Sequence, residues 1–205
     1  MRKILMPLAG VAMLALAFSM AVAADEKKAG GAGVKPGEQA PSFSLQDQDG
    51  KSVNLADLAG KVVVLEWFNN ECPFVVRHHE EKKTMAETSA KWKDKDVVWL
   101  AVNTTNGKTN ADNKAVAGKW SIAYPILNDS TGEVGKAYGA KTTPHMFVID
   151  KTGKIAYAGG IDDDPKGDKA DRVNLVDKAL TELTSGSSVT QPMSKPYGCS
   201  VKYAK

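Results

Sequence analysis

The sequence predicts an α/β domain with a central mixed β-sheet flanked by helices. Two near-continuous apolar runs, residues 62–68 and 97–102, are typical of strands buried on both faces of a sheet. Further on, residues 146–149 and 155–158 read as two strands joined by a tight turn. Helical spacing separates these strands and follows the last of them. Such an order favours a mixed sheet with helices on both faces.

The first 23 residues are expected to form a secretory signal peptide. Arg2 and Lys3 precede a long uncharged apolar run, and the small residues Ala21-Val22-Ala23 end it in the manner of a cleavage site. The alternative is an uncleaved N-terminal membrane anchor. Both interpretations place the domain outside the cytoplasm, periplasmic or extracellular, and cleavage would leave it without stable membrane association.

Composition excludes several classes of function. The formal net charge of +3 falls to +1 once Arg2 and Lys3 are removed, so the chain lacks the basic surface of a nucleic-acid-binding protein. Most of the seven methionines lie in the signal peptide, which excludes a methionine-rich metal carrier. No later segment is apolar enough to cross a bilayer. Two cysteines in an oxidising compartment raise the question of one disulfide.

Four segments are expected along the chain. The signal peptide is followed by residues 24–38, whose Ala, Gly, Lys and Glu content predicts a flexible leader. Residues 39–185 form the folded domain, which is of ordinary single-domain length. Residues 186–205 form a C-terminal tail that carries Cys199.

A small β-hairpin is predicted at the N-terminal end of the domain, where it extends the sheet. Phe43 and Leu45 alternate with polar residues, residues 47–50 supply a turn, and Val53 resumes the apolar pattern.

The helices follow from periodicity and from boundary residues. Pro73 stands at a typical first helical position, and the apolar spacing predicts one helix over 73–92. A polar loop, 104–110, precedes a short helix over 111–120. Residues 150–153 form the turn between the last two strands, and 172–184 have the spacing of a final helix.

Cys72 is the predicted nucleophile. A buried strand delivers it to the start of the helix that begins at Pro73. The unpaired backbone N–H groups and the dipole of a helix N-terminus stabilise a thiolate. Cysteines in this position have lowered pKa values and are reactive.

Several stretches around this cysteine resemble one known family. They are Ala40-Pro41-Ser42-Phe43-Ser44-Leu45, Gly50-Lys51, Leu58-Ala59-Gly60-Lys61, Cys72-Pro73-Phe74-Val75 and Thr143-Pro144-His145-Met146-Phe147-Val148-Ile149-Asp150. Their order and spacing resemble the thioredoxin-like superfamily, in the AhpC/TSA-related redoxin branch, which includes peroxiredoxins and exported thiol-disulfide oxidoreductases. The resemblance implies a thioredoxin-like fold and redox chemistry at a cysteine.

The resemblance assigns roles to particular residues. It implies that Cys72 is the N-terminal, nucleophilic cysteine of a Cys-x-x-Cys motif and that Pro144 is a cis-proline beside it. Thr143 would then offer backbone groups to a substrate disulfide. The expected substrate-bordering residues are Thr143, Pro73, Phe74 and Asn69.

Glu66 lies six residues before Cys72, as the buried acidic residue of thioredoxin does. The resemblance implies that its carboxylate exchanges a proton with the thiol, as a positioned carboxylate can. The alternative is a carboxylate at the end of the strand that faces water.

Two departures from the family patterns limit the chemistry. Val75 stands where the second cysteine of the motif is expected, so the two-thiol cycle within one motif is absent. Leu65 and Asn69 fill the Pro and Thr positions of the peroxiredoxin pattern. A fast peroxidase is therefore not expected.

Cys199 is the other candidate catalytic residue. The tail enters it through Pro196 and Gly198, and it could fold back over Cys72 as a resolving thiol. The alternative is a permanent disulfide between Cys72 and Cys199 that only ties the tail down, which would stabilise the fold by about 2–5 kcal/mol.

The histidines are expected to have minor roles. His78 shares a helix face with apolar residues and is predicted to be partly buried with its hydrogen bonds satisfied, whereas His79 is predicted to be solvated. His145 follows the expected cis-proline. Together with Cys72 and Cys199 it could supply thiolate and imidazole to Cu(I), although no compact Cys/His spacing is present. The leading expectation is that the protein has no metal and no cofactor.

The sequence thus favours an exported thiol-disulfide oxidoreductase or antioxidant redoxin that acts through Cys72, with a weak peroxidase as a variant. The expected partners are protein thiols and disulfides, or small peroxides, with an external thiol as reductant. One alternative is a non-enzymatic module that binds copper or a client protein at the same groove. The other is a structural disulfide without redox chemistry.

Overall fold

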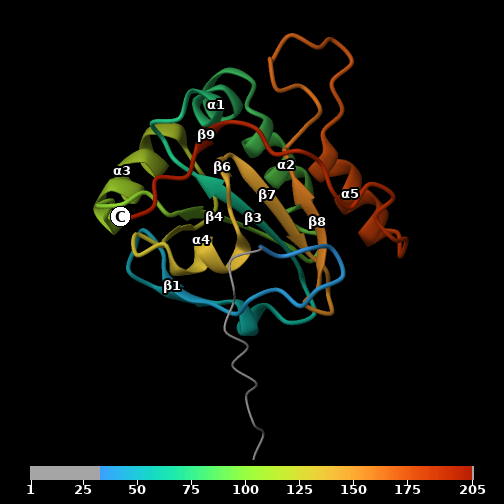
Figure 1. Cartoon of the computed structure of the whole chain (residues 1–205), viewed down its shortest axis with the longest axis horizontal. Helices are drawn as coiled ribbons and strands as arrows, with labels where there is room; N and C mark the ends of the chain where they lie inside the picture. Colours follow the sequence, from blue (N-terminus) through green and yellow to red (C-terminus); the bar gives the residue numbers. More distant parts are fainter. Residues whose placement is uncertain (1–32, 205) are drawn as a thin grey trace, which may run out of the picture.

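A mixed sheet of seven strands forms the centre of the protein (Figure 1). The computed structural model describes residues 33–204, so the predicted signal peptide lies outside the described residues. In spatial order the strands are β2 (Ser52–Asn54), β1 (Ser44–Gln46), β5 (Ile126–Asn128), β4 (Val97–Asn103), β3 (Val62–Phe68), β7 (His145–Ile149) and β8 (Ile155–Gly159). Strand β3 pairs parallel with β4 and antiparallel with β7, which confirms a mixed sheet.

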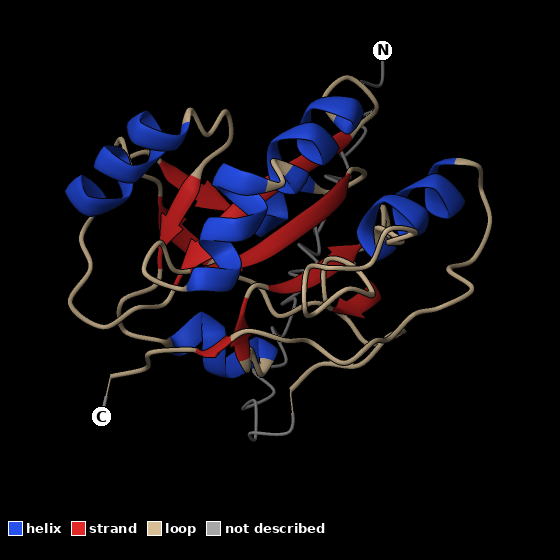
Figure 2. Ribbon diagram, turned by 90° about the horizontal axis from the view of Figure 1, so that it is seen from above, coloured by secondary structure: helices blue, strands red, loops and turns tan. Residues whose placement is uncertain are grey.

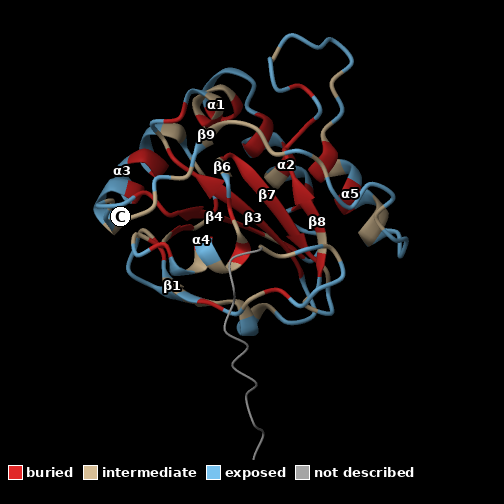
Figure 3. Ribbon diagram, in the orientation of Figure 1, coloured by how far each residue is buried: buried red, intermediate tan, exposed pale blue. Residues whose placement is uncertain are grey.

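The central strand β3 divides the interior into two cores. All seven of its residues are buried, and successive side chains point to opposite faces of the sheet. Val64 and Phe68 contribute to one core, and Leu65 and Trp67 to the other. Figure 3 shows the buried strands enclosed by more exposed helices and loops.

Helices cover both faces of the sheet, as the sequence predicts (Figure 2). Helices α2, α3 and α5 pack on the core that contains Val64, whereas α4 and the short helix η1 pack on the core that contains Leu65. The bounds are η1 (Leu55–Leu58), α1 (Pro73–Val76), η2 (Arg77–Glu81), α2 (Thr84–Trp92), α3 (Asn110–Trp120), α4 (Glu133–Tyr138) and α5 (Leu175–Thr184).

The prediction of one continuous helix over 73–92 is wrong. After α1 the chain makes a wide turn, η2, closed by a hydrogen bond from the Lys82 N–H to the Arg77 carbonyl at 2.8 Å. Lys83 then adopts a left-handed conformation with φ 51° before α2 begins. The wide turn buries both His78 and His79, two adjacent residues that a regular helix would point in different directions.

Two short elements, β5 and α4, are not predicted from the sequence. Strand β5 has three residues, too few for a periodic pattern. Helix α4 lies between Gly132 and Gly139, both with positive φ, and has six residues. The last helix begins at Leu175 and not at residue 172, because Asn174 caps it by accepting a hydrogen bond from the Asp177 N–H.

The folded domain starts earlier than the leader boundary at residue 38 implies. The N–H of Val34 donates to the Tyr138 carbonyl, and the N–H of Gly37 donates to the Ile155 carbonyl at 2.8 Å. Backbone hydrogen bonds therefore hold residues 33–38 against α4 and β8. Such bonds form without apolar side chains, so the low hydrophobicity of this segment does not prevent its ordering. Within residues 33–204 no helix is long and apolar enough to span a membrane.

Candidate active site

Cys72 lies directly after the central strand, at the start of α1. It is the N-cap residue of this helix, with extended backbone angles, and its exposed fraction is only 1%. The Cys72 N–H donates to the Asn69 carbonyl at 3.0 Å, and the Asn69 side chain accepts from the Glu71 N–H at 2.9 Å. Asn69 therefore shapes the turn that presents the cysteine.

The loop before β7 reaches the Cys72 thiol. The Thr143–Pro144 peptide bond is cis, as the resemblance implies, and the Cys72 Sγ donates to the Thr143 carbonyl oxygen at 2.9 Å. Thr143 is 2% exposed, and its hydroxyl finds no hydrogen-bond partner among the residues that the structure describes. That hydroxyl is thus available to a thiolate at Cys72.

The C-terminal tail brings Cys199 to the same place. Its strand β9 (Cys199–Ser200) pairs antiparallel with β6 (Thr142–Thr143), with Cys199 opposite Thr143. In Figure 1 this red segment lies between α1 and β6. Both cysteines are free thiols, Cys72 buried and Cys199 partly exposed. Because Thr143 contacts both residues, the structure brings the two predicted cysteines together.

The two thiols have opposite pKa shifts. Burial acts to raise the pKa of Cys72, but the neighbouring Cys199 thiol, Thr143 and the Val75 N–H outweigh it, so the pKa is lowered. Burial and the adjacent Cys72 raise the pKa of Cys199 to about 11, while Lys202 acts weakly in the other direction. Cys72 is therefore the more acidic thiol of the pair, and Cys199 the less acidic one.

Tyr197 anchors the tail on the N-terminal side of Cys199. Its hydroxyl lies 2.9 Å from the His78 Nε2 and donates to the Asp162 carboxylate. Burial raises the pKa of Tyr197, and burial lowers that of His78 to about 4. The predicted satisfaction of His78 is confirmed, since it also contacts the Thr84 hydroxyl, but the residue is fully buried and not partly buried as predicted.

Tyr203 anchors the tail on the other side of Cys199. Its hydroxyl donates to the Ala140 carbonyl at 2.8 Å. Its ring lies against Gly132 and Gly135, where an added Cβ would approach it to 2.8 and 2.9 Å. The backbone of Lys202 also accepts from the Asn106 N–H at 2.8 Å. The segment that carries Cys199 is thus fixed at both ends.

Glu66 is fully buried on the β3 face that also bears Phe68, so the interpretation that it faces water is wrong. Its carboxylate accepts from the His79 Nε2 at 2.7 Å, the Tyr124 hydroxyl at 2.9 Å and the Trp99 indole at 3.3 Å. His79 is buried in this network, which corrects its prediction as a solvated residue. Within residues 33–204 no hydrogen bond joins Glu66 to Cys72.

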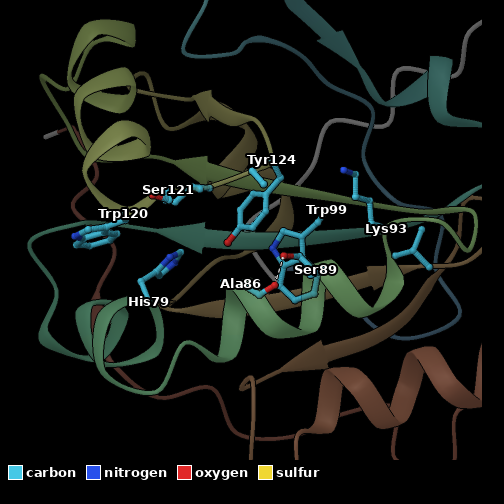
Figure 4. Close-up of a pocket in the computed structure, with 12 residues that line it drawn as sticks. His79, Ala86, Ser89, Lys93, Trp99, Trp120, Ser121 and Tyr124 are labelled. Atoms are coloured by element: carbon cyan, nitrogen blue, oxygen red, sulfur yellow. Dashed lines mark hydrogen bonds between the residues drawn. The ribbon is translucent and has the colours of Figure 1, made fainter.

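The three partners of Glu66 line a cavity of about 240 Å³ beside α2. Figure 4 shows His79, Trp99 and Tyr124 converging there, with Trp120 at one side. The His79 ring stacks on Trp120, with ring centroids 5.1 Å apart. The Glu66 carboxylate is therefore connected to this cavity through its hydrogen-bond partners.

His145 does not join the two cysteines in a metal site. Its ring packs on Phe147, with centroids 4.4 Å apart, on the core opposite that of Cys72. Its Nδ1 accepts from the Lys141 N–H, and burial lowers the pKa of His145 to about 3. No three His, Cys, Asp or Glu side chains in the described part of the chain are grouped to hold a metal ion.

Two other predicted substrate-bordering residues, Pro73 and Phe74, begin α1. Pro73 is exposed at the first position of α1. Phe74 is half-buried, with its ring centroid 6.0 Å from that of Tyr197. Sequence reasoning missed both tyrosine anchors and the buried Asp162, which lies in an acidic stretch typical of a solvated loop. Tyr197 and Tyr203 flank Cys199 in a largely polar tail, and this spacing was the sequence signal that could have indicated the anchors.

Comparisons with known proteins identify the family of this chain. The Redoxin family model matches residues 35–176. The thiol-disulfide oxidoreductase ResA of Bacillus thuringiensis is 32% identical over 119 residues, which are 58% of this chain and 66% of that protein. The chain thus spans about two thirds of the length of this curated relative.

Two solved structures show the same architecture. An uncharacterized conserved protein from Geobacillus kaustophilus has a TM-score of 0.76 and 29% identity, covering 82% of this chain and 92% of the other. A putative thiol:disulfide interchange protein DsbE from Chlorobium tepidum has a TM-score of 0.55 and 28% identity, covering 61% and 84%. The expected thioredoxin-like fold is confirmed, and the chain belongs to the Redoxin family.

Proposed function

We propose that the protein is a thiol-disulfide oxidoreductase that cycles Cys72 and Cys199 between two thiols and one disulfide. The observation that carries this proposal is the pairing of β6 with β9, which sets Cys199 opposite the residue that contacts the Cys72 sulfur. Cys199 thereby takes the role of the second cysteine of the Cys-x-x-Cys motif, whose position is occupied by Val75.

The proposed reaction begins at Cys72. Its thiolate attacks one sulfur of a substrate disulfide, which forms a mixed disulfide and releases the other substrate sulfur as a thiolate. Cys199 then loses its proton and attacks the Cys72 sulfur. This step forms the 72–199 disulfide and releases the second substrate thiolate. The substrate gains two electrons, and the two cysteines lose two.

The surroundings of Cys72 support this assignment. The Cys199 thiol, the Thr143 side chain and the Val75 N–H lower the pKa of Cys72, which favours the reactive thiolate form. Pro73 and Phe74 border the thiol on the side of α1. Glu66 is the proposed proton carrier, because it is fully buried on the same sheet face as the core around Cys72.

Disulfides are the proposed substrates, and peroxides are secondary. Leu65 and Asn69 occupy the positions of the peroxiredoxin Pro and Thr, and the Asn69 side-chain oxygen is engaged by the Glu71 N–H. A peroxide would oxidise Cys72 to a sulfenic acid, and Cys199 would convert it to the disulfide with release of water. The proposed location is outside the cytoplasm, supported by the signal-peptide pattern of residues 1–23.

The test is to treat the reduced protein with oxidised glutathione and map its disulfides by mass spectrometry, before and after dithiothreitol. We expect a reversible 72–199 disulfide, and reduction of a disulfide-bonded protein such as insulin that Cys72→Ala abolishes. Cys199→Ala should leave a persistent mixed disulfide on Cys72. If both single variants kept full insulin reductase activity, the proposal would be wrong.

A further inference from the structure

The two sulfurs of the proposed disulfide differ in their access to solvent. Cys72 is 1% exposed and contributes to the core that contains Val64, Phe68 and Val75. Cys199 is partly exposed and belongs to a two-residue strand whose described pairing is with β6 alone. An outside molecule therefore meets the Cys199 side of the pair first.

The tail that carries Cys199 lies very close to the loop before β7. A Cβ added at Gly198 would lie 2.0 Å from the Thr143 carbonyl oxygen, so only glycine allows this approach. Tyr197 and Tyr203 fix the tail on either side. In the reduced protein only non-covalent contacts hold the tail, so its opening would admit a substrate to Cys72. A 72–199 disulfide would lock the tail closed.

Disulfide exchange requires the attacking thiolate to approach along the S–S axis, opposite the sulfur that leaves. Attack on Cys72 would therefore come from the side away from Cys199, and Cys72 is 1% exposed as a member of the apolar core, against which Cys199 packs only partly buried. Attack on Cys199 would come from outside the tail. With the tail locked, an external thiolate thus reaches the Cys199 sulfur more easily than the Cys72 sulfur.

We propose that an external thiol reduces the 72–199 disulfide by attacking the sulfur of Cys199, with Cys72 as the leaving group. This inference rests on the proposed function. The thiolate forms a mixed disulfide with Cys199, and the electron pair of the broken S–S bond goes to Cys72, which leaves as a thiolate. A second external thiol attacks the external sulfur of the mixed disulfide, which frees Cys199 and yields an oxidised dimer of the reductant.

The electrostatics of the site support the same direction. The surroundings that lower the pKa of Cys72 make it the better leaving group, because a thiol of lower pKa leaves faster. Lys202 lies close enough to lower the pKa of Cys199 slightly, and its positive charge would attract an approaching thiolate. Substrate disulfides thus enter at Cys72 of the open, reduced protein, and the reducing thiol enters at Cys199 of the closed, oxidised protein.

The experiment follows the first bond formed by the reductant. Oxidised full-length protein is mixed with reduced glutathione, quenched in acid with methyl methanethiosulfonate at successive early times, and mapped by mass spectrometry. We expect glutathione on Cys199 and the methylthio cap on Cys72, with at least about tenfold less of the reverse pattern. The Cys72→Ser and Cys199→Ser variants, each glutathionylated separately, calibrate the signals of the two adducts.

Glutathione mainly on Cys72, or equally on both cysteines, would overturn the inference while leaving the two-cysteine cycle intact. Failure to form a 72–199 disulfide in the first step would instead remove the proposed function itself. A second measurement uses Gly198→Ala, in which the tail cannot lie against Thr143. Glutathione should then appear on both cysteines, and an unchanged preference for Cys199 would show that closure of the tail is not its cause.

Discussion

The Thr143 side chain is a residue-scale feature that lowers the pKa of Cys72, next in size after the Cys199 thiol. It is buried without a hydrogen-bond partner in the described part of the chain, and its position lowers the pKa of the Cys72 thiol. A buried hydroxyl left unpaired costs free energy, whereas a hydrogen bond to a charged group stabilises that charge by about 1.5–3 kcal/mol. A thiolate at Cys72 would give the Thr143 hydroxyl an acceptor.

Replacing Thr143 by valine should raise the pKa of Cys72, because the donor to the thiolate is lost while the side-chain shape is kept. At a fixed neutral pH the thiolate fraction should fall by about tenfold. Ultraviolet thiolate absorbance, followed across pH in the reduced protein, measures this change. Thr143→Ser keeps the hydroxyl and serves as the control. Equal titration curves for the valine and serine variants would contradict the assignment.

Two buried histidines make the fold sensitive to acid. Burial lowers the pKa of His78 to about 4 and that of His145 to about 3, both below the ordinary 6.5. The unfolded chain takes up these protons as the pH falls below 6.5, and the folded chain does not. Their stabilising contribution is therefore complete above 6.5 and is lost progressively as the pH falls towards 4 and 3.

His145→Asn isolates one part of this effect, because an amide oxygen can replace Nδ1 as acceptor for the Lys141 N–H. Between about pH 7 and about pH 4.5, the unmodified protein should lose about 2 kcal/mol more unfolding free energy than the variant. Urea unfolding at the two pH values gives the comparison. Parallel losses in both proteins would show that His145 does not contribute to the acid sensitivity.

At the scale of elements, the pairing of β6 with β9 decides whether there are one or two cysteines in the site. Each strand has only two residues, and a pair of this size is not stable alone. Two flanking residues supply the remaining stabilisation. Tyr197 contacts His78 of η2 and the loop at Asp162, and Tyr203 packs on α4. The position of Cys199 thus depends on contacts made by the residues that flank it in the tail.

Gly198→Ala should displace this element without disturbing the sheet. The new Cβ would collide with the Thr143 carbonyl, and φ at this position is +130°. Disulfide formation between Cys72 and Cys199 with oxidised glutathione should slow by about tenfold, the effect of losing about 1.4 kcal/mol of pairing energy. Alkylation of Cys72 should become faster, because the tail segment that shields its thiol is displaced.

Gly186→Ala is the matched control. It also lies in the tail region with positive φ, +81°, but an added Cβ there meets nothing within 4 Å. It should therefore share the backbone strain and keep the disulfide chemistry. If the two variants slowed disulfide formation equally, general strain and not the contact with Thr143 would be responsible.

At the scale of the whole molecule, the proposed disulfide joins the central strand region to the last residues of the chain. Closing so long a loop should stabilise the oxidised protein by about 2–5 kcal/mol over the reduced protein. A lowered pKa at Cys72 stabilises the reduced form, which favours a disulfide that exchanges with its surroundings.

Oxidised protein should therefore have a higher melting temperature than reduced protein and should still equilibrate with a glutathione redox buffer. Scanning calorimetry measures the first property, and thiol alkylation after equilibration measures the second. A purely structural disulfide would remain intact in such buffers, with a potential below about −300 mV. That result would favour the structural alternative over the redox cycle.

Sequence patterns predicted the main strands well, because their continuous apolar runs are typical of strands buried on both faces. Residues 62–68 and 97–103 are central strands whose two faces are both buried, which requires continuous hydrophobicity. Short elements such as α4 and the wide turn at 77–81 escape such reasoning. Their local sequence is compatible with several conformations, and burial of His78 and His79 selects one of them.

The sequence by itself determined the fold class, the place of Cys72 after a buried strand, and the absence of a second cysteine three residues later. These features depend on local patterns and spacing. Only the tertiary structure decided that Cys199 lies opposite Thr143, that Glu66 pairs with His79, and that His145 points away from the cysteines. Those outcomes depend on contacts between segments far apart in the chain, and local sequence does not encode which distant segments meet.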